Sequence, residues 1–140
     1  MRISARCEYA CNAILELSLR WPNREPIQIQ TISERQKIPM KYLVQILIQL
    51  KRMGFVTSLR GKEGGYVLAK PPNRIRLGEI IRQTGGPLLP IAESGSKKET
   101  VFATVWKEVE EAMAKILDKI TFEDIANKAK GIEGAVVYQI

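Results

Sequence analysis

The chain contains no histidine and only two cysteines among its 140 residues. Without histidine, Ser-His-Asp and Cys-His catalysis and the usual zinc-enzyme sites are excluded. Cys7 and Cys11 are too few and too close together to form a disulfide framework. No nucleophile with a base beside it and no constellation of carboxylates stands out, so we expect that the protein is not an enzyme.

Long apolar runs and phosphate-binding glycine loops are also missing. No apolar run approaches the roughly 20 residues that a membrane span needs, and residues 1–6 lack the apolar core of a secretory signal. Gly64-Gly65 and Gly85-Gly86 do not stand between a strand and a helix, as nucleotide-binding loops do. We therefore expect a cytoplasmic protein with no membrane partner and no cofactor.

Positive charge is concentrated in the first half of the chain. Residues 1–76 hold 14 Lys and Arg against 5 Asp and Glu, a net charge of +9, whereas residues 77–140 hold 8 against 10, a net charge of −2. This asymmetry indicates that the first half binds a polyanion. The alternative is a basic surface that is merely solvated.

The first expected element is a helix over residues 4–19. Ser4 is suited to cap its N-terminus, and the apolar residues follow at helical spacing. They are Tyr9, Ala10, Ala13, Ile14 and Leu17. After a loop, residues 27–29 alternate in polarity and predict a short strand that pairs with a later hairpin.

Residues 31–54 predict a helix, a turn and a second helix. Thr31-x-x-Glu34 fits a capping box that opens the first helix, which ends by Lys37. A residue before proline avoids the helical region, so Ile38 belongs to the turn, and Pro39 suits the first position of the second helix. Gly54 is expected to end that helix.

The second helix has an apolar side and a polar side. The apolar stripe is Leu43, Ile46, Leu47, Leu50 and Met53, and the other side carries Lys41, Gln45, Gln49 and Arg52. Glutamine bonds base edges and phosphates, while lysine and arginine bind phosphates or guanine, so the polar side is suited to DNA. The alternative is an ordinary amphipathic helix with a solvated side.

A basic hairpin follows directly. Residues 55–59 and 65–69 predict two strands, joined by the tip Arg60-Gly-Lys-Glu-Gly64, whose glycines permit positive φ. Arg60 and Lys62 are suited to grip phosphates or enter a minor groove, although a charged turn can also be only exposed. The order of helix pair, polar-sided helix and basic hairpin predicts a winged helix-turn-helix that binds double-stranded DNA.

The second half of the chain predicts a dimerisation arm. A short helix over 77–84 and a loop over 87–97 lead to a long helix over 98–120. Its apolar residues step by three and four and are Phe102, Val105, Val109, Met113, Ile116 and Ile120. One wing domain cannot easily cover this stripe, so we expect a homodimer, and the alternative is packing on its own domain. Thr121-Phe-Glu-Asp124 predicts a last helix that stops at Gly131, and the role of the 135–140 tail stays open.

The expected architecture is therefore mainly α with a small β-hairpin. Residues 1–86 form a winged helix-turn-helix DNA-binding domain, 87–97 a loop, and 98–140 the dimerisation helix with a C-terminal helix and tail.

Several segments are similar to one known family. The most specific is the stretch 54–72, Gly-Phe-Val-Thr-Ser-Leu-Arg-Gly-Lys-Glu-Gly-Gly-Tyr-Val-Leu-Ala-Lys-Pro-Pro. Tyr9-Ala10, the segment 38–43 followed by Gln45, and the segment 75–81 followed by Gly86-Pro87 also match. The chain thus resembles the Rrf-two family of bacterial winged-helix regulators, which includes IscR, NsrR and CymR, closely over residues 1–90 and in layout beyond.

The resemblance implies a homodimer joined by the long helix, with the helix from Pro39 in the major groove and the wing in a flanking minor groove. Matching positions imply DNA contacts by Tyr42, Gln45, Arg60 and Lys62. Together with the residue pattern, the predicted DNA-binding set is Lys41, Tyr42, Gln45, Gln49, Arg60, Gly61 and Lys62. We expect a sequence-specific transcriptional regulator, acting as a repressor on a near-palindromic operator.

Two departures from the family pattern matter. The family commonly has an acidic residue that can sense cytosine where this chain has Val44, so the base preference is expected to differ. Cluster-bearing members place three cysteines in the loop before the long helix, whereas residues 87–106 contain none here. No iron–sulfur cluster bound in the usual way is expected, and the resemblance leaves a protein or a small molecule as the effector.

Two alternative functions remain open. Cys7, Glu8 and Cys11 are the candidates for a metal or redox sensor, because the two cysteines lie one helical turn apart. We favour the interpretation that both cysteines are small packing residues and predict no metal site. The other alternative is a protein-interaction module whose long helix or apolar tail engages a partner enzyme.

Overall fold

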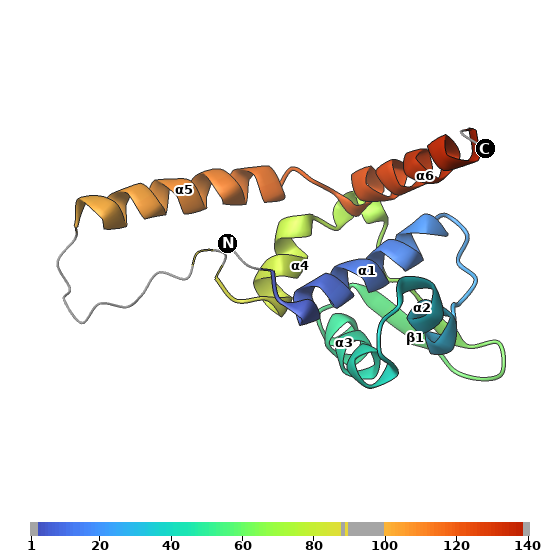
Figure 1. The fold of residues 1–140 in the computed structure, drawn as a ribbon. Helices are drawn as coiled ribbons and strands as arrows, with labels where there is room; N and C mark the ends of the chain where they lie inside the picture. The colour runs from blue at the N-terminus through green and yellow to red at the C-terminus, as the bar shows by residue number, and fades with distance from the viewer. Residues whose placement is uncertain (1–2, 88, 90–99, 139–140) are drawn as a thin grey trace.

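The protein forms a helical body with a small hairpin and one long helix that projects from the body (Figure 1). The computed structural model describes residues 3–87, 89 and 100–138, with the backbone alone for 133–138. Its elements are α1 (Ala5–Leu19), α2 (Ile29–Gln36), α3 (Met40–Arg52), β1 (Val56–Leu59), β2 (Gly65–Leu68), the 3-10 turn η1 (Pro72–Arg74), α4 (Leu77–Thr84), α5 (Val101–Leu117) and α6 (Phe122–Tyr138). The predicted fold class, mainly α with a small β-hairpin, is confirmed.

Helix α1 begins where the sequence predicts. The Ser4 hydroxyl oxygen accepts a hydrogen bond from the backbone N–H of Cys7 at 3.1 Å, which satisfies one of the free amides of the first turn. Four of the predicted apolar residues are buried and Tyr9 is half-buried. The buried ones are Ala10, Ala13, Ile14 and Leu17. Helix α1 packs against α2, α3, α4 and α6 and so forms the centre of the body.

Helix α2 begins earlier than expected, and the capping box at Thr31 and Glu34 is wrong. The helix starts at Ile29 after Gln28, whose carbonyl accepts a hydrogen bond from the Thr31 N–H at 3.0 Å. The start is set by tertiary pairing, because Ile27 exchanges two backbone hydrogen bonds with Tyr66 of β2, at 3.0 and 2.8 Å. Only Ile27 of the predicted strand therefore pairs with the wing.

The turn between α2 and α3 follows the prediction closely. Helix α2 ends at Gln36, and Lys37 adopts a left-handed backbone with φ 54°. Pro39 is the N-cap residue of α3, and Met40 is the first helical residue. The prediction that Pro39 occupies the first helical position is therefore wrong by one residue. Helix α3 ends at Arg52, close to the predicted stop at Gly54. Gly54 has φ +83°, a backbone conformation that favours glycine.

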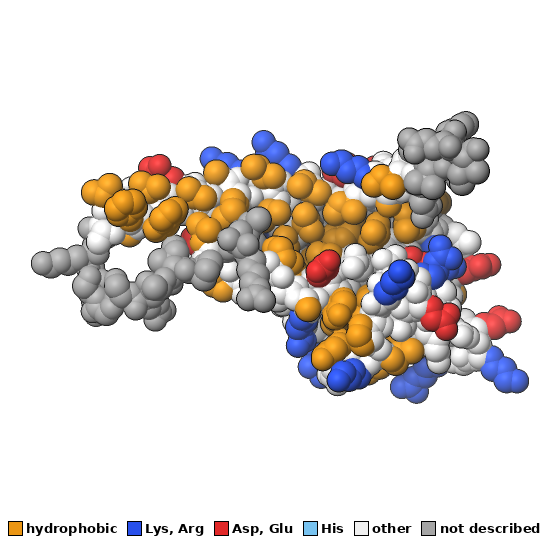
Figure 2. Space-filling view, in the orientation of Figure 1, with side chains coloured by type: hydrophobic (Ala, Val, Ile, Leu, Met, Phe, Trp, Pro, Cys, Tyr) orange, Lys and Arg blue, Asp and Glu red, His pale blue; other side chains and the backbone are white. Residues whose placement is uncertain are grey.

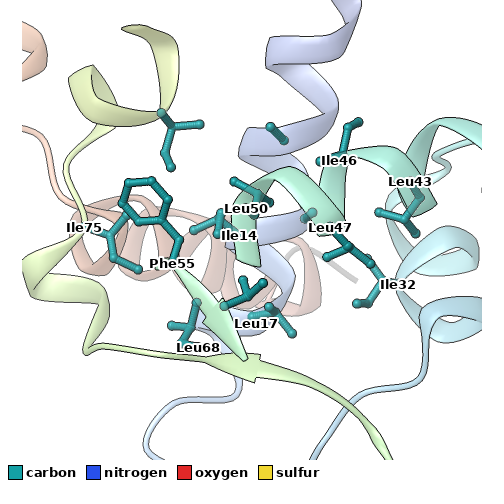
Figure 3. Packing of buried hydrophobic residues seen from close by; sticks show 14 of the residues in the cluster. Ile14, Leu17, Ile32, Leu43, Ile46, Leu47, Leu50, Phe55, Leu68 and Ile75 are labelled. Carbon is teal, nitrogen blue, oxygen red and sulfur yellow. The ribbon is translucent and has the colours of Figure 1, made fainter. Parts of the chain in front are cut away.

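The core lies where α1, α3 and the hairpin meet (Figure 3). The predicted stripe of α3 is buried at Leu43, Ile46, Leu47 and Leu50, and Met53 packs against its edge. Phe55, which precedes β1, is almost fully buried against the same cluster. Burying such side chains contributes about 1.5–3 kcal/mol each, so this cluster holds α3 at a defined angle to the wing.

After α5 the chain returns to the body. The N–H of Leu77 donates to the Ile120 carbonyl at 2.9 Å, and the N–H of Phe122 donates to the Ile75 carbonyl at 2.9 Å. The Phe122 ring is fully buried in the core. Asp118, just past α5, accepts hydrogen bonds from Arg82 of α4 at 2.6 Å. The C-terminal end of α5 is therefore anchored to the body, while the rest of the helix extends away from it (Figure 1).

Helix α6 starts as predicted but does not stop at Gly131. Thr121 and Asp124 bond reciprocally, with the Thr121 N–H donating to the Asp124 carboxylate at 3.0 Å and the Asp124 N–H donating to the Thr121 hydroxyl at 3.2 Å. These bonds lower the pKa of Asp124. The helix continues through Gly131 and Gly134 to Tyr138, because an interior glycine weakens a helix by only about 1 kcal/mol and does not by itself end it.

Some predictions fall outside the described residues. These are most of the 87–97 loop, the expected helix start at Lys98, and residues 139–140 of the tail. Residues 135–138 of that tail are helical. Among the residues that the structure describes, no helix is both long and apolar enough to cross a membrane.

Candidate nucleic-acid interface

Three of the predicted DNA contacts lie together on the first turns of α3. Lys41, Tyr42 and Gln45 are exposed there, on the side of the helix away from the buried leucines. The Tyr42 ring stacks on Tyr9 of α1 with 6.1 Å between ring centroids. The Lys41 ammonium lies 5.0 Å from the Tyr42 ring centroid, a cation–π distance. The stacking on Tyr9 and the cation–π contact thus hold Tyr42 and Lys41 together on the exposed side of α3.

A recess of about 410 Å³ opens beside this group, between α1 and α3. It is lined by Ala5, Arg6, Tyr9, Tyr42, Gln45 and Ile46. Sequence reasoning did not single out Arg6, which the fold places beside two predicted contact residues. The sequence did contain an indication, because Arg6 is a basic residue in the first turn of a predicted helix within the strongly basic half of the chain.

Gln49 differs from the other predicted contacts of α3. Its amide oxygen accepts hydrogen bonds from the Arg6 guanidinium at 3.1 and 2.5 Å. Its amide nitrogen donates to the Gln83 carbonyl at 2.9 Å. Both polar ends of the side chain are therefore used inside the protein, and Gln49 joins α3 to α1 and α4.

The wing carries the remaining predicted contacts at its tip. In the register of the hairpin, Val56 lies opposite Leu68 and Leu59 lies opposite Gly65. Arg60, Gly61 and Lys62 follow β1 and are all exposed. Of the two glycines in the predicted tip, Gly61 adopts positive φ, at +107°, whereas Gly64 does not; Gly65, the first residue of β2, has φ +149°.

The tip is tightly wound, and two hydrogen bonds tie the wing to neighbouring elements. A Cβ on Gly64 would lie 2.2 Å from the Leu59 carbonyl oxygen, so only glycine fits. The Gln28 side chain donates to the Lys62 carbonyl at 3.2 Å. Lys51 at the end of α3 donates to the Ser58 hydroxyl of β1 at 2.6 Å. These bonds tie the tip to the residue before α2 and the first strand of the wing to the end of α3.

A buried carboxylate that sequence reasoning missed positions α2. The Glu16 side chain of α1 is only 3% exposed and lies 2.6 Å from the Arg35 guanidinium. The Gln36 amide donates to it at 2.8 Å, and Arg20 lies 3.7 Å away. Glu16 thus ties the first helix of the helix-turn-helix to α1. The sequence pattern that could have indicated this role is a single glutamate between two apolar residues of a helix expected to pack in the body.

The cysteine pair lies away from solvent. Cys7 is buried, Cys11 is half-buried, and Glu8 between them is exposed. Burial, and then the neighbouring Cys7, raise the pKa of the Cys11 thiol to about 12. Metal ligation requires the thiolate, which this environment disfavours. Within residues 3–87, 89 and 100–138, no three His, Cys, Asp or Glu side chains gather as a metal site would need.

Helix α5 has an apolar surface that stays exposed in the part of the chain that the structure describes. None of its residues is buried, and Phe102 and Ile116 are 68% and 62% exposed. Val105 and Val109 are exposed as well, and Met113 is half-buried. The half-buried Ile120 lies beyond α5, because the helix ends at Leu117 and not at the predicted Ile120. Figure 2 shows hydrophobic side chains gathered along this projecting helix. A surface of this kind is typical of an interaction site.

The fold and the surface of α3 with the wing define a winged helix-turn-helix DNA-binding protein. The model of the Rrf2 family, described as an iron-dependent transcriptional regulator, matches residues 3–128. The chain therefore belongs to the Rrf2 family of transcriptional regulators.

Two relatives are similar in sequence to this chain over nearly all of its length. It is 34% identical over 139 residues to an HTH-type transcriptional regulator of Synechocystis sp., covering 96% of this chain and 94% of that protein. It is 31% identical over 140 residues to the HTH-type transcriptional regulator CymR of Bacillus subtilis, covering 100% of both.

Solved structures agree as well. The structure of B. subtilis CymR, the global cysteine regulator of that organism, matches with a TM-score of 0.81 at 31% identity over 91% of this chain and 98% of that one. The structure of T. potens IscR matches with a TM-score of 0.77 at 32% identity over 92% and 88%. The predicted family and the function of a DNA-binding transcriptional regulator are confirmed.

Proposed function

We propose that the protein acts in the cytoplasm as a homodimeric repressor that binds a near-palindromic operator. The observation that carries the proposal is the exposure of Lys41, Tyr42 and Gln45 on α3, together with an exposed basic tip on a wing that the Lys51–Ser58 hydrogen bond joins to the end of the same helix. In this arrangement α3 enters the major groove and the wing follows the flanking minor groove.

The two elements have different tasks in this proposal. Arg60 and Lys62, with the backbone of Gly61 between them, grip phosphates and so supply salt-dependent affinity. Lys41 and Tyr42 position α3 on the backbone of the duplex. Gln45 reaches base edges, where a glutamine amide pairs best with adenine. Gln49 supports α3 from inside, through Arg6 and Gln83.

Pairing of subunits uses the surface of α5. A second copy of the same helix covers the stripe from Phe102 to Ile120 and places two recognition helices about one helical turn of DNA apart. Residues 1–86 are then the DNA-binding domain, 87–97 the connection and 98–140 the pairing segment. Within that last segment, α6 also supports the DNA-binding body through the buried Phe122.

The test is direct binding to DNA selected from random duplexes, followed by a salt titration. Wild-type protein is expected to select a near-palindrome and to bind it as a dimer. The double variant Arg60→Ala/Lys62→Ala should bind more weakly, and its slope of log K against log salt should fall by about 2. Lys119→Ala/Lys128→Ala removes the same charge from exposed positions outside the interface, so it should keep the wild-type slope.

Two results would contradict the proposal. One is an unchanged salt slope for the wing variant, or an equal loss for the control. The other is a selection that yields no motif at all. Repression is tested separately by in-vitro transcription from a promoter that carries the selected site, where added protein should lower the yield of transcript.

A further inference from the structure

Helix α3 exposes aliphatic side chains on the same side as its predicted DNA contacts. Val44 and Ile48 are 38% and 39% exposed, although the core side of the helix is already complete with four buried residues. Neither side chain is needed to fill the body. Their exposure to water is unfavourable unless something apolar covers them.

The two residues form one patch with Lys41 and Gln45. Residues three or four apart on a helix are neighbours, and Lys41, Val44, Gln45 and Ile48 are linked by such spacings on all four sides of the group. The patch therefore combines a cation, an amide and two aliphatic side chains. Whatever covers the aliphatic pair also meets the positive charge of Lys41.

The chemistry of the major groove offers one apolar group, the C5-methyl of thymine. Cytosine carries only hydrogen at that carbon, and the purine edges present polar atoms. DNA also supplies the negative charge that Lys41 and the basic wing demand. A partner protein would have to match the same cations, so the charge favours DNA as the occupant.

We propose that Val44 and Ile48 recognise thymine methyl groups in each half-site of the operator. The inference rests on the proposed function and deepens it, because it names a base feature that the helix selects. Gln45 pairs with an adenine edge, and the aliphatic pair packs against the methyl of a thymine in the same or an adjacent base pair. Removing one such methyl group should lower affinity about fourfold.

The experiment replaces single thymines of the selected operator by deoxyuridine, which removes only the methyl group. Wild-type protein should bind about fourfold more weakly when the uracil falls at a contacted position of the half-site. Val44→Ala or Ile48→Ala should bring the ratio of thymine to uracil affinity close to one at its own position. Both side chains are exposed, so the variants should keep the wild-type circular dichroism spectrum.

Gln45→Ala is the matched control, because it weakens binding from the same patch without removing an aliphatic group. It should retain the wild-type ratio of thymine to uracil affinity. Equal binding of thymine and uracil operators at every position would overturn the inference and leave the proposed function standing. A ratio that survives in both Val44→Ala and Ile48→Ala would also overturn it. Failure to bind any duplex specifically would overturn both.

Discussion

The side-chain amide of Gln49, in α3, donates a 2.9 Å hydrogen bond to the backbone carbonyl of Gln83, near the end of α4. The same side chain accepts two hydrogen bonds from Arg6 of α1. One glutamine thus connects α3 to two other helices. Helix α4 ends at Thr84, so the connection meets the chain just before the segment that leads toward α5.

Gln49→Ala is expected to weaken operator binding without changing base preference. The substitution removes bonds within the protein, worth less than about 1 kcal/mol each at a partly exposed site, and loosens the seating of α3. Competition assays with single-base operator variants measure the preference. Gln45→Ala is the control, because a direct base contact should change the ranking of the variants. A changed ranking for Gln49→Ala would return Gln49 to the set of base contacts.

Local patterns predicted much of this interface. The cap at Ser4, the buried stripe of α3 and the left-handed glycine after it depend mainly on residues close in sequence. The same holds for the wing, where the turn glycines determine the shape of the tip. Such features follow from spacing and backbone preference alone.

The features that prediction missed depend on distant residues. Helix α2 starts early because Ile27 pairs with Tyr66, 39 residues further along the chain. The engagement of Gln49 depends on Gln83, 34 residues away. A polar residue on a helix can contact DNA or support the helix, and only the fold separates the two.

Glu16→Ala should destabilise the protein and impair DNA binding together. The carboxylate is buried and its partners Arg35 and Gln36 belong to α2, so its loss releases α2 from α1. We expect a loss of about 2–4 kcal/mol in the free energy of unfolding, measured by urea titration. Arg35 is 58% exposed, so Arg35→Ala should cost less.

Glu34→Ala is the matched control for the buried carboxylate. Glu34 lies on α2 beside Arg35 but is exposed, and surface substitutions of this kind change stability by at most about 0.5 kcal/mol. Equal stability of Glu16→Ala and Glu34→Ala would show that the network around Glu16 does not hold the helix-turn-helix.

Val109→Glu should separate the subunits while each subunit stays folded. Val109 is exposed in the single chain and lies in the apolar stripe of α5, where a charge in a pairing surface would be buried without a partner. Light scattering after size exclusion should report a monomer, and affinity for the two-half-site operator should fall by a factor of about 100 or more. Lys107→Glu introduces the same carboxylate on the opposite side of α5 and should leave the dimer intact. A dimeric Val109→Glu variant would place the subunit contact elsewhere.

Cys11 should react slowly with alkylating reagents near neutral pH. Burial raises the pKa of its thiol to about 12, so at pH 8 only about one thiol in ten thousand is the reactive thiolate. The rate of iodoacetamide labelling at Cys11, followed by mass spectrometry, should keep rising with pH to about 12. A cysteine in an unfolded peptide, with a pKa of about 9, should level off well below that.

The raised pKa also fixes the sign of the stability effect. The folded protein holds the Cys11 proton more tightly than the unfolded chain does, so the contribution of this thiol to stability is full below the unfolded pKa of about 9 and is lost as pH rises toward about 12. The difference in unfolding free energy between wild type and Cys11→Ala should shift in that direction over this range. Cys11→Ala should also bind the operator as wild type does, before and after treatment with peroxide. Rapid labelling at pH 7, with loss of DNA binding on oxidation that Cys11→Ala abolishes, would instead establish a redox sensor at this pair.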